Sequence, residues 1–149
     1  MLPDDVFRDR LEQTLVEIEA WARKTRDCAT IDVGASQKYW GMLVLPHFPT
    51  ACPFELIIKS EQKFSLQLAD ETYEDRPVEH FDLFPALARA VEAGHIEKIE
   101  ILDAATDTLV GVRTRVELAP GWDWIGERRI APPVESEECR THRFLPYRR

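Results

Sequence analysis

The chain has 149 residues, of which 44% are hydrophobic and 31% charged, and such a chain folds as a globular domain without a metal or a disulfide. Its formal net charge of −8 opposes nucleic-acid binding, and no apolar run approaches the roughly 20 residues of a membrane span. The acidic start differs from a signal peptide, and three cysteines are too few for a disulfide framework, so we expect a cytoplasmic protein with reduced thiols.

The first predicted element is an amphipathic helix over about residues 4–26. Its apolar side chains recur at steps of three or four and share one face, as packing on a core requires: Phe7, Leu11, Leu15, Ile18 and Ala22. Asp4 and Asp5 lie in the first turn and basic residues lie in the last turn, and both complement the helix dipole.

Strands are predicted next. Residues 30–33 alternate in polarity, and residues 38–45 are rich in β-prone side chains. Residues 47–52 lie between prolines and are expected to form an irregular loop or an edge segment. Residues 54–59 and 63–68 form the clearest hairpin, because the second arm places its apolar side chains on one face and its polar side chains on the other.

The stretch from residue 70 to residue 82 is acidic. Six carboxylates surround the single Arg76, among them Asp70, Glu71, Glu74, Asp75 and Glu79. The simplest interpretation is a solvated loop, since Pro77 interrupts any regular element. The alternatives are an electrostatic docking surface for a basic partner and a carboxylate or metal site, although the spacing lacks the alternation and central glycine of a calcium loop.

A second helix is predicted over about residues 83–93. Asp82 is a candidate N-cap, and Gly94 is placed to end the helix in a left-handed conformation. A second hairpin follows, in which residues 96–102 pair with residues 109–118, and the returning arm alternates between apolar and charged side chains.

Trp122 and Trp124 follow this hairpin. They are expected to close the rim of the core or, where exposed, to contact a partner. Beyond Gly126 the hydrophobic pattern ends, so we expect residues 127–149 to form an extended arm outside a single domain of residues 1–126. Arginines and aromatic residues interleave in the arm, which favours contact with a partner or with a second copy of the chain; the alternative is a frayed terminus.

The order of elements predicts the α+β class. We expect an antiparallel sheet of about five to six strands, with the N-terminal helix and the second helix packed on it. The layout and the acidic balance are similar to those of acidic adaptor proteins such as type III secretion chaperones, without a shared motif.

No catalytic signature occurs in the chain. The six glycines are scattered, and neither a phosphate loop nor a Gly-x-Ser-x-Gly or His-Glu-x-x-His motif is present, so no cofactor is predicted. His47 with Cys52 and Cys139 with His142 have ligand-like spacing for zinc, but each pair alone is a weak pattern and no metal site is predicted. Thiol catalysis by Cys52 with a histidine base lacks the positive surroundings that stabilise a thiolate.

The leading hypothesis is a non-catalytic protein-binding module of the adaptor, chaperone, immunity or inhibitor type. Its partner is expected to be a protein with a basic surface, because the body of the chain is strongly acidic. The candidate binding residues are Asp70, Glu71, Glu74, Asp75, Glu79, Trp122 and Trp124. The alternative hypothesis is a small enzyme with a pocket around His47 and Cys52.

Overall fold

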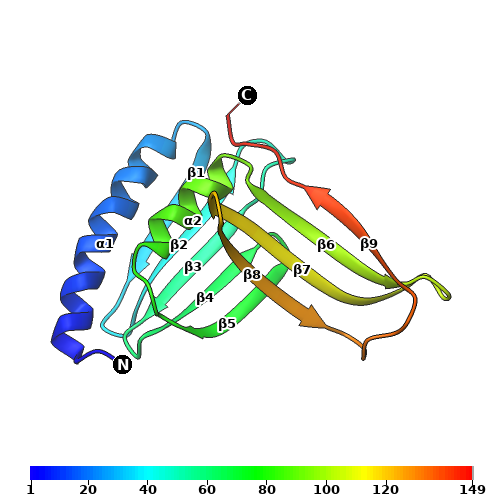
Figure 1. The fold of residues 1–149 in the computed structure, drawn as a ribbon. Helices are drawn as coiled ribbons and strands as arrows, with labels where there is room; N and C mark the ends of the chain where they lie inside the picture. The colour runs from blue at the N-terminus through cyan, green and yellow to red at the C-terminus, as the bar shows by residue number, and fades with distance from the viewer. Residues whose placement is uncertain (149) are drawn as a thin grey trace.

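The computed structural model describes residues 1–148 and contains two helices and two antiparallel sheets, so the predicted α+β class is confirmed (Figure 1). The helices are α1 (Asp4–Thr25) and α2 (Leu83–Glu92). The first sheet has the strand order β1-β2-β3-β4-β5. Its strands are β1 (Ala29–Ala35), β2 (Tyr39–Pro46), β3 (Phe54–Lys59), β4 (Lys63–Leu68) and β5 (Glu71–Pro77).

The second sheet has the order β8-β7-β6-β9. Its strands are β6 (Ile96–Asp103), β7 (Thr108–Ala119), β8 (Trp122–Arg129) and β9 (Glu137–Arg143). Both hairpins expected from the sequence are present, as β3–β4 and β6–β7. The chain therefore forms nine strands in two sheets among its described residues, where one sheet of five to six strands was expected.

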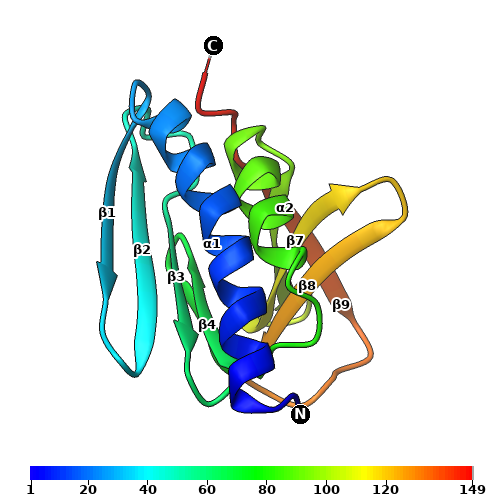
Figure 2. The same ribbon diagram turned by 90° about the vertical axis from the view of Figure 1, so that its left-hand side faces the viewer.

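Both helices cover the same face of the first sheet (Figure 2). The strands present alternate side chains to that face, and these form a continuous core that includes Met42, Val44, Leu56, Ile58 and Leu66. Each fully buried side chain of this size contributes roughly 1.5–3 kcal/mol to folding. The helices also contact each other, since Trp21 Nε1 of α1 donates a hydrogen bond of 2.8 Å to Glu92 Oε1 of α2.

The second sheet packs against β5 through an aromatic contact. Tyr73 of β5 lies opposite Leu66 of β4, so its ring faces the same side of the first sheet as the helices. Its hydroxyl lies 2.7 Å from Thr114 Oγ1 of β7, and its ring meets the indole of Trp124 of β8 edge-on at 5.2 Å. Gly126 lies beneath the same ring, and its missing side chain lets the two sheets approach closely.

The acidic stretch after β4 is not an irregular loop. Residues 71–77 form β5, so the loop expected over residues 70–82 is wrong for this part of the chain. A β-bulge interrupts the pairing of β5 with β4, and Asp75 adopts a left-handed backbone conformation there, with φ of 54°. Such bulges are common at sheet edges, where they twist the outermost strand.

The end of the chain also differs from the expected arm. Residues 137–143 form β9, which pairs with β6 over seven register positions. Tyr147 is fully buried, and its hydroxyl donates a hydrogen bond of 2.5 Å to the carbonyl oxygen of Cys52. Leu145 forms an isolated bridge with Ala51. The residues between 127 and 148 thus contribute a sheet edge and part of the core.

The ends of α2 match the sequence prediction in part. Gly94 has a φ of 80°, the left-handed conformation expected after the helix. Asp82 precedes the helix but makes no side-chain capping hydrogen bond. Neither α1 nor α2 is long and apolar enough to cross a membrane.

We predict that Gly126→Ala destabilises the protein. A Cβ atom at this position would lie 2.5 Å from the ring of Tyr73, so the junction between the sheets must shift. The free energy of unfolding, measured by urea denaturation, should fall by about 1–3 kcal/mol. Gly34→Ala is the matched control, because a Cβ atom there meets nothing within 4 Å, and its effect should stay within about 0.5 kcal/mol. Equal effects of the two substitutions would contradict this account of the junction.

Candidate functional site

Three of the five predicted carboxylates are engaged in ion pairs. Asp70 accepts hydrogen bonds of 3.2 Å from Lys98 Nζ, and Asp75 accepts one of 2.6 Å from Lys59 Nζ. Hydrogen bonding to these lysines lowers the pKa of both aspartates. Neither side chain adds net negative charge to its surroundings, since each is balanced by a lysine at contact distance.

Glu71 is buried, although the acidic residues of this stretch were expected at the surface. The residue is only 5% exposed, and both of its carboxylate oxygens accept hydrogen bonds of 2.9 Å from the guanidinium of Arg128 on β8. A forked pair of this kind fixes geometry strongly. Glu71 therefore joins β5 to β8 and holds the two sheets together, and its carboxylate does not face solvent.

Glu74 and Glu79 are exposed and have no ion-pair partner within residues 1–148. Glu74 lies in the bulge of β5, whereas Glu79 lies in the segment between β5 and α2. Of the five candidate binding carboxylates, these two therefore carry the unbalanced negative charge, and Asp82, the sixth carboxylate of the stretch, is also exposed without an ion-pair partner in the described chain.

Glu79, Trp122 and Trp124 line one groove. It has a volume of about 300 Å³ and lies between the end of β5, the segment that leads to α2, and the start of β8. We call it the tryptophan groove, and its other lining residues are Phe64, Arg76, Pro77, His80, Leu83, Leu118 and Asp123. Three of the seven predicted binding residues are thus brought together, and the other four lie outside this lining.

The spacing of the two tryptophans on β8 explains why both indole rings line the groove. Trp122 and Trp124 are two residues apart on β8, so their side chains point to the same face of the strand. Trp124 packs against Tyr73 and the core, whereas Trp122 at the strand end is only partly covered. The turn before β8 contains Gly121 with a φ of 79°, a conformation that favours glycine.

The charged side chains of the groove differ in the partners that they contact. The guanidinium of Arg76 lies over the ring of Tyr73, with its central carbon 5.7 Å from the ring centre. Asp123 lies 3.2 Å from Arg115 Nη1, so its charge is already balanced. Glu79 is the one acidic side chain of this lining that no described basic group neutralises.

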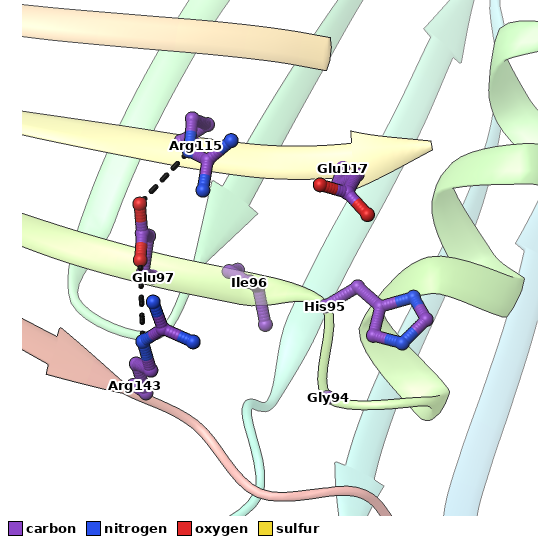
Figure 3. A pocket seen from close by; sticks show the side chains of 7 residues that line it. All are labelled: Gly94, His95, Ile96, Glu97, Arg115, Glu117 and Arg143. Carbon is purple, nitrogen blue, oxygen red and sulfur yellow. Dashed lines mark hydrogen bonds and ion pairs between the residues drawn. The ribbon is translucent and has the colours of Figure 1, made fainter. Parts of the chain in front are cut away.

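A smaller pocket lies on the opposite face of the second sheet. It has a volume of about 130 Å³, and Figure 3 shows Glu97 there between two arginines. Glu97 Oε1 lies 2.8 Å from Arg115 Nε, and Glu97 Oε2 lies 3.6 Å from Arg143 Nε. Hydrogen bonds to Glu97, which has the larger effect, and to Asp123 raise the pKa of Arg115. This network ties β6, β7 and β9 together and holds Asp123 at the edge of the tryptophan groove.

The residues of the alternative enzyme hypothesis do not form a reactive pair. Cys52 is fully buried, and burial raises the pKa of its thiol to about 12, so the thiol is protonated at neutral pH. His47 is exposed in the loop before it. Cys139 and His142 alternate to opposite faces of β9, which prevents them from binding one metal ion. No group of three ligating side chains placed to hold a metal ion occurs in the described chain.

Sequence reasoning missed several residues of the groove. Phe64, Leu83 and Leu118 follow ordinary core patterns and become groove walls only because β4, α2 and β7 meet at this point. Arg76 was recognised only as an isolated cation in an acidic stretch. The single local signal for the site was the pair of closely spaced tryptophans.

Comparison of the chain with family models, with curated proteins and with solved structures finds no match. What the tryptophan groove can bind follows from its own side chains. An indole face attracts a cation, most strongly a guanidinium, and contributes roughly 0.5–2 kcal/mol to binding. A carboxylate in the same lining adds charge complementarity for this kind of group.

We predict that the three cysteines react very unequally. Cys139 is exposed, whereas Cys28 and Cys52 are buried, and burial raises the pKa of both buried thiols. Iodoacetamide at about pH 8 should therefore alkylate Cys139 alone in the folded protein and all three cysteines in urea, as mass spectrometry of peptides would show. Cys139→Ser serves as the control and should leave the native protein unlabelled. Rapid labelling of Cys52 in the native protein would contradict its burial and support the alternative hypothesis of an enzyme that uses this thiol.

Proposed function

We propose that the protein is a non-catalytic protein-binding module that binds a basic partner at the tryptophan groove. The observation that carries this proposal is the convergence of Glu79, Trp122 and Trp124 on one groove. Tryptophan is enriched among the residues that dominate binding energy at protein interfaces, because it buries a large surface at a small entropic cost.

Charge supports a basic partner. The chain has a net charge of −8, which speeds the approach of a positively charged protein over a long range. Glu79 supplies a carboxylate without an ion-pair partner to the groove that the partly covered ring of Trp122 also lines, and the cation of the same lining, Arg76, lies over the ring of Tyr73. An arginine or lysine of the partner would place its cationic end at Glu79 and its aliphatic stem against the indole.

This function fits an adaptor, chaperone, immunity protein or inhibitor. We also place the protein in the cytoplasm, in keeping with three free cysteines. Self-association through the C-terminal segment remains part of the proposal, since β9 pairs only with β6 within residues 1–148 and has an exposed outer edge. The enzyme alternative is less well supported, because Cys52 lies buried in the core.

Substitutions in the groove test this proposal. Trp122→Ala and Glu79→Lys should each weaken binding of the native partner, the first by about 2 kcal/mol or roughly 30-fold in dissociation constant. Quantitative affinity capture from the source cells identifies the partner, and calorimetry with the purified partner then measures the dissociation constants. Binding should also weaken as salt concentration rises.

Glu17→Lys is the matched control for Glu79→Lys. It makes the same charge change on the exposed side of α1, and we expect it to preserve binding apart from a small general loss of attraction. A captured partner that binds wild type and both groove variants equally would reject the tryptophan groove as the site. Circular dichroism confirms that the variants are folded.

A further inference from the structure

β9 forms an open edge of the second sheet. It pairs with β6 over residues 137–143 and with no other strand of the described chain, and every one of its residues is exposed. Figure 1 shows it as the outermost strand of this sheet. An open edge presents a row of backbone N–H and C=O groups that can pair with a strand of another chain.

β9 lacks features that commonly prevent such pairing. Edge strands are often protected by a lysine, a proline or a β-bulge, but residues 137–143 contain neither lysine nor proline and keep one continuous register with β6. The edge strands β5 and β8, in contrast, each contain a register shift. The backbone of β9 is therefore regular enough to accept a further strand.

Two hydrogen bonds that flank β9 show which of its backbone groups point outward. The amide of Phe144 donates to the carbonyl oxygen of Ile96 at 3.2 Å. The amide of Ala104 donates to the carbonyl oxygen of Ser136 at 2.7 Å. Because bonding alternates along an antiparallel ladder, the even-numbered residues of β9 bond to β6 and the odd-numbered residues direct their N–H and C=O groups away from it.

The charges of β9 are complementary to those of a second β9 that runs in the opposite direction. Glu137 and Glu138 lie at the start of the strand, and Arg140 and Arg143 lie towards its end. The strand therefore has no net charge, although the chain carries −8. Glu138 makes no ion pair within residues 1–148, so its carboxylate is free to meet a cation of another chain.

We propose that β9 pairs with β9 of a second copy of the chain, antiparallel and with Cys139 at the two-fold axis. The two four-stranded sheets then form one continuous sheet across the dimer. The inference rests on the self-association that is part of the proposed function and gives it a definite geometry, but it does not involve the tryptophan groove.

Backbone alternation and charge together select this register. Outward groups occur only at odd-numbered residues, so the axis lies at a residue and not between two residues. An axis at Cys139 places Glu138 opposite Arg140 of the second copy on both sides of the axis. An axis at Glu138 or at Arg140 instead places two like charges directly opposite each other, which is destabilising. An axis at Thr141 places Arg140 opposite His142 and leaves Glu138 beyond the end of the paired strand.

Arg140 is able to serve two carboxylates. Its Nη2 lies 2.9 Å from Asp107 Oδ1 of the same chain, and both side chains of this pair are exposed. A guanidinium has five N–H donors, so Arg140 can keep Asp107 and also bind Glu138 of the second copy.

Sedimentation equilibrium of the full chain tests the pairing. The wild type should show a reversible monomer–dimer equilibrium. Thr141→Pro removes an outward N–H group and should abolish the dimer. Val33→Pro is the matched control at the open edge of β1, where the bond from the His47 amide to the Cys28 carbonyl oxygen shows that Val33 also directs its N–H group outward. A chain that stays monomeric at millimolar concentration, or equal effects of the two prolines on the dimer, would overturn the inference.

Charge exchange tests the register. Glu138→Arg and Arg140→Glu should each raise the dissociation constant of the dimer roughly tenfold, because each replaces two attractive pairs by two repulsive ones. The double variant reverses both pairs and should recover the wild-type constant. Circular dichroism checks that these variants are folded. A double variant that dimerises no better than the single variants would reject the register with Cys139 at the axis.

Cys139 gives an independent measure of the same register. Opposite residues of a hydrogen-bonded pair have Cα atoms about 5.5 Å apart, a distance that a disulfide can span. Oxidation by copper–phenanthroline in air should therefore link two native chains through Cys139, whereas Cys28 and Cys52 are buried. Cys139→Ser should prevent the link and keep the non-covalent dimer. A dimer that is not linked under these conditions would contradict the register.

Two variants separate this inference from protein binding at the tryptophan groove. Trp122→Ala should dimerise like the wild type, and Thr141→Pro should bind the basic partner like the wild type. A monomeric wild type that still binds its partner would reject the dimer alone, and a wild-type dimer that binds no basic partner would reject the groove proposal alone.

Discussion

The relative position of the two sheets depends on the contact between the ring of Tyr73 and Gly126. It fixes the distance between β5 of the first sheet and β8 of the second, and the hydroxyl bound to Thr114 fixes the lateral position of the ring. The segment that carries Glu79 continues from β5, and the two groove tryptophans lie on β8. Both walls of the tryptophan groove are therefore positioned by one aromatic contact, and a shift of this junction changes the groove and the core together.

Ion pairs near the same junction neutralise several carboxylates of the acidic stretch. The bond between Glu71 and Arg128 links the sheets, and Asp70 pairs with Lys98 of β6. The surface pairs contribute little stability individually, roughly 0–1 kcal/mol each, but they neutralise the carboxylates of Asp70 and Asp75. Of the five candidate binding carboxylates, only Glu74 and Glu79 have no ion-pair partner within residues 1–148, so the acidic composition alone does not locate a binding surface.

The sequence predicted most strands with a regularly buried face and missed three that lie at sheet edges, whereas the edge strand β1 was predicted from residues 30–33. The β3–β4 hairpin has one buried face and a clear period of two, and β7 alternates in burial from Val112 to Glu117. The three strands that were missed, β5, β8 and β9, each pair on one side only within the described chain, and β9 is exposed at every position. An edge strand without a buried face has no hydrophobic period to read. The tryptophan groove escaped prediction for a related reason, since Glu79 and Trp122 are 43 positions apart and meet only through tertiary packing.

Tyr147 closes the core from the far end of the chain. Its ring is fully buried and its hydroxyl reaches Cys52, 95 positions earlier. During synthesis, the first sheet and both helices leave the ribosome before this ring becomes available to them. The core of the nascent domain therefore stays incomplete until Tyr147 is synthesised. A fusion partner or tag attached close behind Tyr147 would hinder the packing of its ring into the core.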